Sequence, residues 1–260
     1  MQSDRQPTFV IIHAMGNDVD CWQAYPHFWR FLEREGAVPY VLPGDRGRPR
    51  EKGWTIESMA DEIVGAFAGQ LELLGFANGA VIIQSILERH NERVHSAIIV
   101  NSRFPTAAST ASRPPIDMQG KAPPMAELVD AGLARWFTPF AVRSNSPGAV
   151  NAREAFLRMD PEAYRDFQYA ASTFSLRDDT SLAQVRQPIS LIAGIDDATF
   201  ADMLELHRVL PVSRVELICG RHFLHLEHPE NIMSAIYHHR LWTPIGNRVE
   251  QPLQFSTLGQ

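Results

Sequence analysis

The sequence is poor in cysteine, has no excess of basic residues and contains no long apolar run. Only two of its 260 residues are cysteine, Cys21 and Cys219, which is too few for a disulfide framework and favours a reducing compartment. Acidic residues outnumber basic ones by 30 to 24, whereas binding to nucleic-acid phosphates needs a concentrated basic surface. The first apolar run, residues 9–12, is far too short for a signal sequence or a membrane span. We therefore expect a cytoplasmic protein with no nucleic-acid partner and no membrane partner.

Internal repeats and a glycine-rich phosphate loop after the first apolar run are also missing, so we expect no nucleotide or other cofactor. The composition is that of an ordinary globular protein, with 45% apolar and 21% charged residues, and the length suits one domain or one core with an insertion.

Short apolar, β-rich runs alternate with helix-like stretches along most of the chain. This alternation predicts an α/β fold with a mostly parallel, doubly wound sheet. The expected strands are residues 8–14, 38–42, 71–76, 97–101, 189–194 and 214–219. Helices are expected at 22–35, 55–67, 79–93, 201–210 and 229–242.

The alternation stops between residues 105 and 186, where no clean strand pattern occurs. Helical patterns near 125–136, 147–158 and 161–173 predict a helical lid, also called a cap, inserted between two sheet strands. The predicted core is therefore 1–104 together with 187–260, and the predicted lid is 105–186. The polar stretch 243–260 is expected to be an extended tail or a short terminal element.

Residues 73–80 (L-L-G-F-A-N-G-A) predict a sharp turn between a strand and a helix. The pattern Gly-x-Ser-x-Gly in that setting holds a nucleophile at the tip of the turn, and its glycines permit close packing. Here alanine stands at the tip, as Ala77, and the two glycines are present. Taken alone, the same letters also fit an ordinary strand-to-helix turn.

The loop after the first strand, residues 11–17 (I-I-H-A-M-G-N), lies where an oxyanion hole is expected. The backbone N–H groups of Met15 and of Asn78, which follows the turn tip, would point at a developing negative charge. His13 is a candidate substrate-binding residue, and a purely structural loop histidine is the alternative.

Two later segments supply an acid and a base. Residues 191–197 (L-I-A-G-I-D-D) form a strand that ends in carboxylates, of which Asp197 fits a triad acid better than Asp196. His222 follows the next expected strand, in the position of a general base.

His222, His225 and His228 also raise the possibility of a metal site. Pro229 is expected to start a helix, so the three side chains would not share one helical face. We therefore expect no metal.

The three candidate positions occur in the chain order nucleophile, acid, histidine: Ala77, Asp197, His222. This order is the one expected for the α/β-hydrolase fold and differs from the order in other triad enzymes.

With these motifs, the chain resembles the α/β-hydrolase superfamily and, more narrowly, the 3-oxoadipate enol-lactonase group of lactonases and esterases. The resemblance spans nearly the whole chain. It rests on H-A-M-G-N-D-x-D-x-W (13–22), G-F-A-N-G (75–79), R-W-F-T (135–138), D-P-E-A-Y (160–164), L-R-D (176–178), G-x-x-D (194–197) and H-F-L-H-L-E-H-P-E (222–230). It implies hydrolysis of a small ester, lactone or enol-lactone through a covalent acyl-enzyme. The chain departs from the family at residue 77, where the family has serine.

A methyl group cannot attack a carbonyl, so hydrolysis with Ala77 in place should be very slow. Three explanations remain open: a Ser→Ala substitution that inactivates an esterase or lactonase, a natural non-hydrolytic lyase, cyclase or isomerase that uses His222 and Asp197 as a general base, and a non-catalytic ligand-binding protein. Under each, the expected partner is a small ester or lactone. The lid aromatics expected near it are Trp136, Phe137, Phe140, Tyr164 and Phe167.

Overall fold

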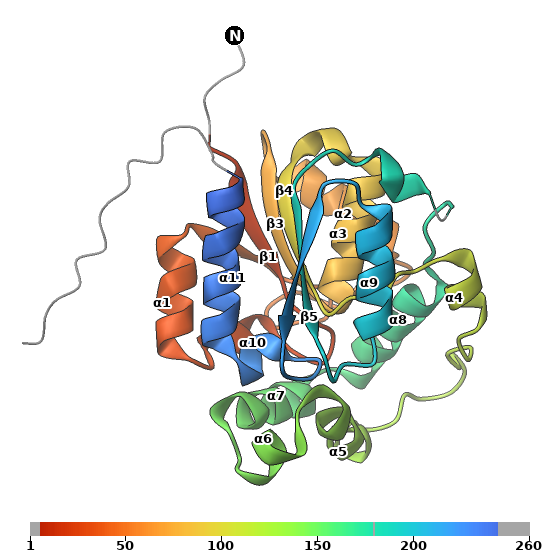
Figure 1. Ribbon diagram of the computed structural model, residues 1–260. Helices are drawn as coiled ribbons and strands as arrows, with labels where there is room; N and C mark the ends of the chain where they lie inside the picture. Colours follow the sequence, from red (N-terminus) through yellow and green to blue (C-terminus); the bar gives the residue numbers. More distant parts are fainter. Residues whose placement is uncertain (1–5, 179, 244–260) are drawn as a thin grey trace, which may run out of the picture.

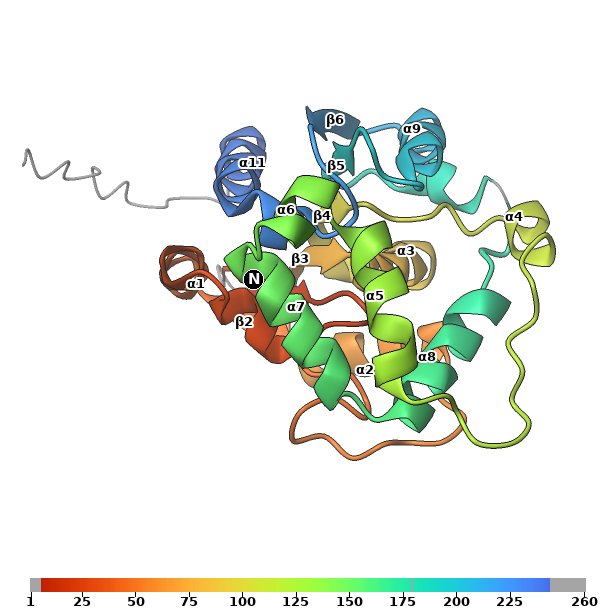
Figure 2. The same ribbon diagram turned by 90° about the horizontal axis from the view of Figure 1, so that it is seen from below.

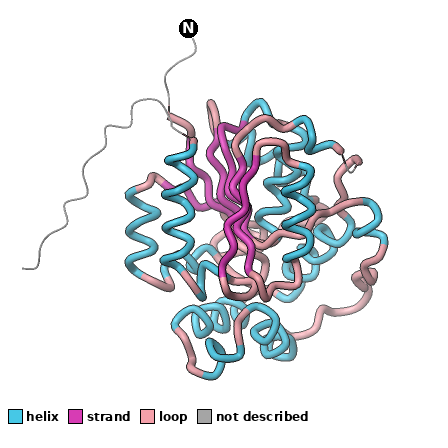
Figure 3. The backbone as a smooth tube through the Cα atoms, in the orientation of Figure 1, coloured by secondary structure: helices cyan, strands magenta, loops and turns pink. Residues whose placement is uncertain are grey.

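A parallel six-stranded sheet forms the centre of the molecule (Figure 3). The computed structural model describes residues 6–178 and 180–243. The sheet has the order β2-β1-β3-β4-β5-β6, and each neighbouring pair is parallel. The strands are β1 (Thr8–Ile12), β2 (Ala37–Tyr40), β3 (Leu71–Phe76), β4 (Val94–Val100), β5 (Ile189–Gly194) and β6 (Ser213–Ile218).

The inner strands are continuous apolar runs because helices cover both faces of a parallel sheet. Every residue of β3 and β5 is buried, whereas the edge strand β6 is mostly half-buried. The register aligns Ile12 with Gly75, and Phe76 with Val100. The carboxyl ends of β1, β3 and β4 therefore meet at one edge of the sheet.

Two layers of helices enclose the sheet, with α1 and α11 on one face and α2, α3 and α9 on the other (Figure 1). Each layer buries its own cluster of apolar side chains against the strands. These helices are α1 (Pro26–Arg34), α2 (Ile56–Ala66), α3 (Asn78–Arg89), α9 (Phe200–Val209) and α11 (Pro229–Trp242).

Among the described residues, five α-helices lie between β4 and β5 in the sequence, and α5, α6 and α7 lie over the carboxyl ends of the strands (Figures 1 and 2). Three of the five begin with a capping residue followed by proline: Thr138, Ser146 and Asp160 each accept a hydrogen bond from a backbone N–H of the first turn. The helices are α4 (Ala107–Ala111), α5 (Met125–Trp136), α6 (Pro139–Arg143), α7 (Pro147–Arg158) and α8 (Pro161–Thr173).

The expected α/β fold with a parallel central sheet is confirmed, and the helices expected at 125–136, 147–158, 161–173 and 229–242 have the same bounds in the structure. The helix expected at 22–35 begins only at Pro26, which lacks an N–H and suits the first helical turn, and a separate 3₁₀ turn (Val19–Gln23) precedes it. The short helices α4, α6 and α10 (Leu224–Glu227) were not predicted, since four or five residues carry too little periodicity.

Within residues 6–178 and 180–243, none of the helices combines the length and the apolar composition that crossing a bilayer requires. Except for Thr243, the predicted tail at 243–260 lies outside the described residues.

Candidate active site

Ala77 lies at the tip of the turn between β3 and α3, with φ 51° and ψ −113°. This conformation is strained for any residue with a Cβ and persists only where the surroundings enforce it. The N–H of Ala77 donates to the carbonyl of Val100 at 2.9 Å, and its own carbonyl accepts from the N–H groups of Ala80 and Val81. The backbone is therefore held on both sides of the tip by the neighbouring strand and by the first turn of the helix.

The two glycines beside the tip are required by backbone packing. A Cβ on Gly79 would lie 2.5 Å from the carbonyl oxygen of Ile12 and 2.7 Å from that of His13. A Cβ on Gly75 would lie 2.7 Å from the carbonyl oxygen of Gly79 and 2.8 Å from the N–H nitrogen of Ala80. Real Cβ atoms do not approach backbone so closely, so only glycine fits at either position.

His222 and Asp197 form a hydrogen-bonded pair beyond the ends of β6 and β5. The Nδ1 atom of His222 lies 2.6 Å from Oδ2 of Asp197, and the Asp197 side chain is 3% exposed. The other carboxylate oxygen accepts from the N–H of Thr199 at 3.0 Å, so both oxygens have partners. Asp196 is exposed, and the structure places Asp197 rather than Asp196 beside the histidine. The pair leaves Nε2 of His222 free to exchange a proton with a bound molecule.

Asn101, just after β4, holds the loop that carries His222. Its side-chain amide donates to the carbonyls of Arg221 and His222 at 2.8 and 3.0 Å, and its carbonyl accepts from the N–H of Gly194 at 2.7 Å. Asn101 has φ 46°, a conformation that asparagine tolerates better than most residues. Sequence analysis missed this residue, although a polar side chain at the carboxyl end of a strand was a usable signal.

A cavity of about 260 Å³ brings these positions together. Ala77, Asp197 and His222 line it together with Met15 and Asn78, the residues expected to form the oxyanion hole. Asn78 is the first residue of α3, where a backbone N–H has no partner within the helix. The other lining residues are Asn101, Arg103, Arg113, Pro114, Ile116, Arg135, Trp136, Gln168, Ala171, Ser172, Ala198 and Thr199.

Three residues expected to bind substrate lie elsewhere. His13 is 1% exposed and forms an ion pair with Asp45, its Nε2 lying 2.8 Å from a carboxylate oxygen. Phe137 is fully buried against the ring of Phe223, and Phe140 is 74% exposed. None of the three is among the described residues that line the cavity beside Ala77. Helical periodicity indicates a buried face but not which buried side chains meet a cavity.

Trp136 is the one of the expected substrate-binding residues that lines the cavity. Its ring stacks on Phe223 with 4.7 Å between the ring centres, and the imidazole of His222 also stacks on Phe223, at 5.8 Å. Tyr164 and Phe167 are buried and face a separate small space beside His13. The aromatic packing therefore links the lid to the histidine loop.

The loop after β2 places the side chain of Asp45, largely buried, beside His13. Burial by itself would raise the pKa of Asp45, but the hydrogen bond and the charge of His13, with the N–H groups of Arg46 and Val19, lower this pKa below its usual value. A carboxylate held ionised in this way fixes His13 in place. The pair is a support for the loop that carries Met15.

The three histidines considered as metal ligands diverge. His225 is fully buried against the rings of Trp22 and Phe76, while His222 faces the cavity. His228 precedes α11. Across the part of the chain that the structure describes, no group of three or more histidine, cysteine or acidic side chains is arranged to hold a metal ion.

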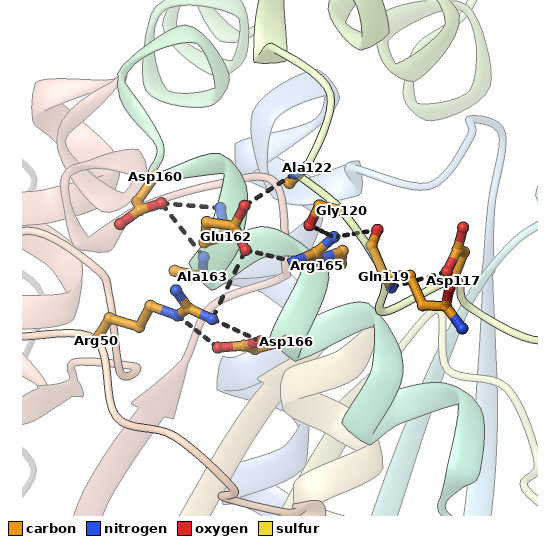
Figure 4. A network of polar contacts seen from close by, with 10 residues as sticks. All are labelled: Arg50, Asp117, Gln119, Gly120, Ala122, Asp160, Glu162, Ala163, Arg165 and Asp166. Atoms are coloured by element: carbon orange, nitrogen blue, oxygen red, sulfur yellow. Dashed lines mark hydrogen bonds and ion pairs between the residues drawn. The ribbon is translucent and has the colours of Figure 1, made fainter.

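A polar network on α8 anchors the segment 112–124, which connects α4 to α5 (Figure 4). Arg165 donates to the carbonyl of Gly120 at 2.9 Å, and Glu162 accepts from the N–H of Ala122 at 2.8 Å. Arg165 and Glu162 also pair with each other at 2.5 Å. Because Arg113 and Ile116 of this segment line the cavity, the network determines where that wall lies.

Arg50 links the same network to the sheet side of the molecule (Figure 4). Its Nε and Nη2 atoms contact the two carboxylate oxygens of Asp166 at 2.6 and 3.0 Å, and Glu162 lies 3.8 Å away. A bidentate arginine–carboxylate pair has a defined geometry. The loop after β2 and helix α8 are thereby fixed to one another.

The family model described as "Alpha/beta hydrolase family" matches residues 9–235, and the chain belongs to that family. No curated protein sequence matches the chain significantly.

Solved structures with the same fold include a hydrolase from Pseudomonas aeruginosa PA01, at 17% identity over 90% of this chain and 89% of that one, with a TM-score of 0.78. The enol-lactonase from Burkholderia xenovorans LB400 is 18% identical over 92% and 94% of the two chains, with a TM-score of 0.76. A thermophilic esterase from Thermogutta terrifontis is 18% identical over 92% and 90%, with a TM-score of 0.74. At such identities the similarity establishes the fold.

Proposed function

We propose that the cavity is the site of a hydrolase for a small carboxylic ester, lactone or enol-lactone, with Ala77 at the position of the nucleophile. The observation that carries the proposal is the strained backbone of Ala77 in a cavity that also contains the His222–Asp197 pair. An alanine has no need of this conformation, whereas a serine there would present its hydroxyl at the tip of the turn. Membership of the alpha/beta hydrolase family supports the same assignment.

The proposed chemistry assigns one role to each residue. A serine at position 77 would attack the carbonyl, His222 would accept its proton and later return it to the leaving group, and Asp197 would orient His222. The N–H groups of Asn78 and Met15 would stabilise the oxyanion. Helices α4–α8 would act as the lid over the bound ester. With a methyl group at position 77, the site binds and polarises an ester but forms no acyl-enzyme.

Restoring the hydroxyl tests the proposal. In the Ala77→Ser variant we expect hydrolysis of p-nitrophenyl acetate and of a γ-lactone to rise by at least about a thousandfold over the parent protein. The double variant Ala77→Ser/His222→Ala is the control and should fall back to the parent rate. A single variant that hydrolyses neither compound faster than the parent would contradict the proposal.

A second candidate function is favoured by the retention of His222 and Asp197, which a pure binding protein does not need. In this alternative the pair acts as a general base for an elimination, cyclisation or isomerisation that requires no nucleophile. The two readings differ in one measurement. If His222→Ala in the Ala77 protein abolishes turnover of a compound that the parent converts, the general-base function holds. If both proteins bind the compound saturably and neither forms product, the protein is a non-catalytic binding protein.

A further inference from the structure

Arginine side chains from three different segments line the cavity beside Ala77 and His222. Arg103 follows β4, Arg113 belongs to the segment 112–124, and Arg135 lies near the end of α5. The only carboxylate among the described lining residues is Asp197, whose charge faces His222. The cavity therefore carries an excess of positive charge.

Arg103 is the most constrained of the three, with 9% of its surface exposed. Its Nη2 atom donates to the carbonyls of Ala171 and Phe174, and its Nη1 atom contacts the hydroxyl of Thr110 at 3.4 Å. The Nε atom is buried without a hydrogen-bond partner among the described residues. All the partners of this buried cation are therefore neutral.

Among the described residues, no carboxylate is hydrogen-bonded to the buried Arg103. Burial, and to a smaller extent the positive charge of Arg113, lowers the pKa of Arg103 to about 10, against the attraction of Asp202. Asp202 attracts both Arg103 and Arg113 through space, although burial, the larger effect, raises the pKa of Asp202. Among residues 6–178 and 180–243, no ion pair within 4.0 Å joins a carboxylate to Arg103, Arg113 or Arg135. A buried cation in such a setting is costly unless an anion joins it.

A structural role accounts for part of this arrangement only. Arg103 ties β4 to the end of α8, and the guanidinium of Arg135 lies 5.6 Å from the ring centre of Trp136. Neither role explains why Arg113, an exposed residue of a different segment, brings a further positive charge to the same cavity.

We propose that the ligand of this cavity carries an acidic group, a carboxylate or a phosphate, which Arg113 and Arg135 bind directly while Arg103 supplies fixed positive charge from the wall. The ester or lactone carbonyl would then lie at Ala77 and Asn78, on the other side of the cavity. The inference rests on the proposed function for the reacting group alone. The acidic group follows from the arginines.

Binding to the Ala77 protein tests the inference without any need for turnover. The probes are monomethyl glutarate, its neutral counterpart dimethyl glutarate, and methyl 4-phosphonobutanoate, with Kd measured by ligand-observed NMR and calorimetry. We expect at least one of the two acidic esters to bind about tenfold more tightly than the neutral diester, and to lose affinity as sodium chloride is raised. The acidic ester that binds more tightly identifies the group as carboxylate or phosphate.

The double variant Arg113→Gln/Arg135→Gln should weaken the preferred acidic ester about tenfold and leave the diester unchanged. Arg103 is kept, because it also holds the carbonyls of Ala171 and Phe174. Arg208→Gln, which removes an exposed arginine of α9, is the matched control and should change neither Kd. Equal affinity for acidic and neutral esters, absence of acidic-ester binding at millimolar concentration, or equal weakening of both by the double variant would each overturn the inference.

The outcome is separable from that of the proposed function. A charge preference that survives in an Ala77→Ser variant without hydrolytic activity would leave the anion site standing and remove the hydrolase proposal. If the Ala77→Ser variant hydrolyses neutral and acidic esters with equal kcat/KM, the hydrolase proposal stands and the anion site is removed.

Discussion

The carbonyl oxygen of Ile12 lies 2.5 Å from the point that a Cβ on Gly79 would occupy. The first residues of α3 thus pack directly on the end of β1, two residues after Ala77. Because the clash is with backbone, neither partner can move without shifting the strand or the turn.

Replacing Gly79 by alanine should therefore destabilise the fold by about 1–3 kcal/mol, the usual cost of forcing extra atoms into a packed core. Gly65→Ala is the matched control, since Gly65 lies in α2 with nothing within 4 Å of the added Cβ. The control should stabilise the protein by up to about 1 kcal/mol. Urea denaturation of both variants measures the two effects, and equal effects on the two would contradict the packing argument.

The pairing of Asp197 with His222 predicts that catalysis depends on Asp197 and not on the adjacent Asp196. In an Ala77→Ser background, Asp197→Asn should lower kcat/KM for p-nitrophenyl acetate by about 10³–10⁴, because the imidazole loses the partner that fixes its tautomer. Asp196→Asn is the control and should retain most of the activity, since Asp196 is exposed. Similar losses in both variants would refute the assignment of Asp197.

Asn101 should act as a positioning residue for His222. In the Ala77→Ser background, Asn101→Ala removes two hydrogen bonds to the histidine loop and one to the end of β5. We expect kcat to fall about tenfold to a hundredfold with little change in KM, because a displaced base slows the chemical step. A rise in KM at constant kcat would show instead that Asn101 contacts substrate.

The network on α8 should control the mobility of the segment 112–124. Arg165→Met removes the hydrogen bonds to the carbonyls of Gly120 and Gln119, each worth about 0.5–1.5 kcal/mol. Amide hydrogen exchange across residues 119–122 should therefore accelerate about tenfold. Arg153→Met removes an exposed ion pair on α7 and should leave this segment unaffected. Unchanged exchange in Arg165→Met would mean that other contacts hold the segment.

The buried side chain of His225 should make the protein less stable in mild acid, because only the unfolded chain takes up a proton there. Burial, with smaller effects from the charges of His13 and His222, lowers the pKa of His225 from 6.5 to about 3. Between these two values the unfolded chain binds a proton that the folded chain does not, so the free energy of unfolding falls as the pH falls. From pH 7 to pH 5 this one residue should remove about 2 kcal/mol.

Urea denaturation at both pH values measures the loss, and His225→Asn should remove this part of the pH dependence whatever its effect at pH 7. If the variant and the parent lose the same free energy between pH 7 and pH 5, another group is responsible.

Much of the fold could be predicted because local patterns determined it. The β3 strand is apolar throughout, and the four helices α5, α7, α8 and α11 have the bounds that their periodicity and prolines indicated. Capping residues followed by proline start a helix through local hydrogen bonds and a fixed φ, which needs no tertiary information. Short helices such as α10, which has four residues and no side-chain cap, show no such signal and could not be predicted from the sequence.

The residues of the candidate site likewise fall into those that the sequence could place and those that only the packing of the lid helices places. Ala77, Asp197 and His222 could be placed from the sequence because each follows a strand, and parallel strands end at one edge of the sheet. His13, Phe137 and Phe140 could not, because whether a buried or exposed side chain faces a cavity depends on how the helices of residues 105–186 pack. The same packing brings Arg103, Arg113 and Arg135 together from three segments that share no sequence pattern.

The sequence by itself therefore determined the strand–turn–helix at Ala77 and the order of the acid and the histidine that follow it, since these depend on neighbours along the chain. Only the tertiary structure decided that Ala77 keeps a strained backbone, because the hydrogen bond to its N–H comes from Val100 on the neighbouring strand. It also decided that a positively charged cavity lies over this turn, because electrostatic environment is a property of side chains that meet in space.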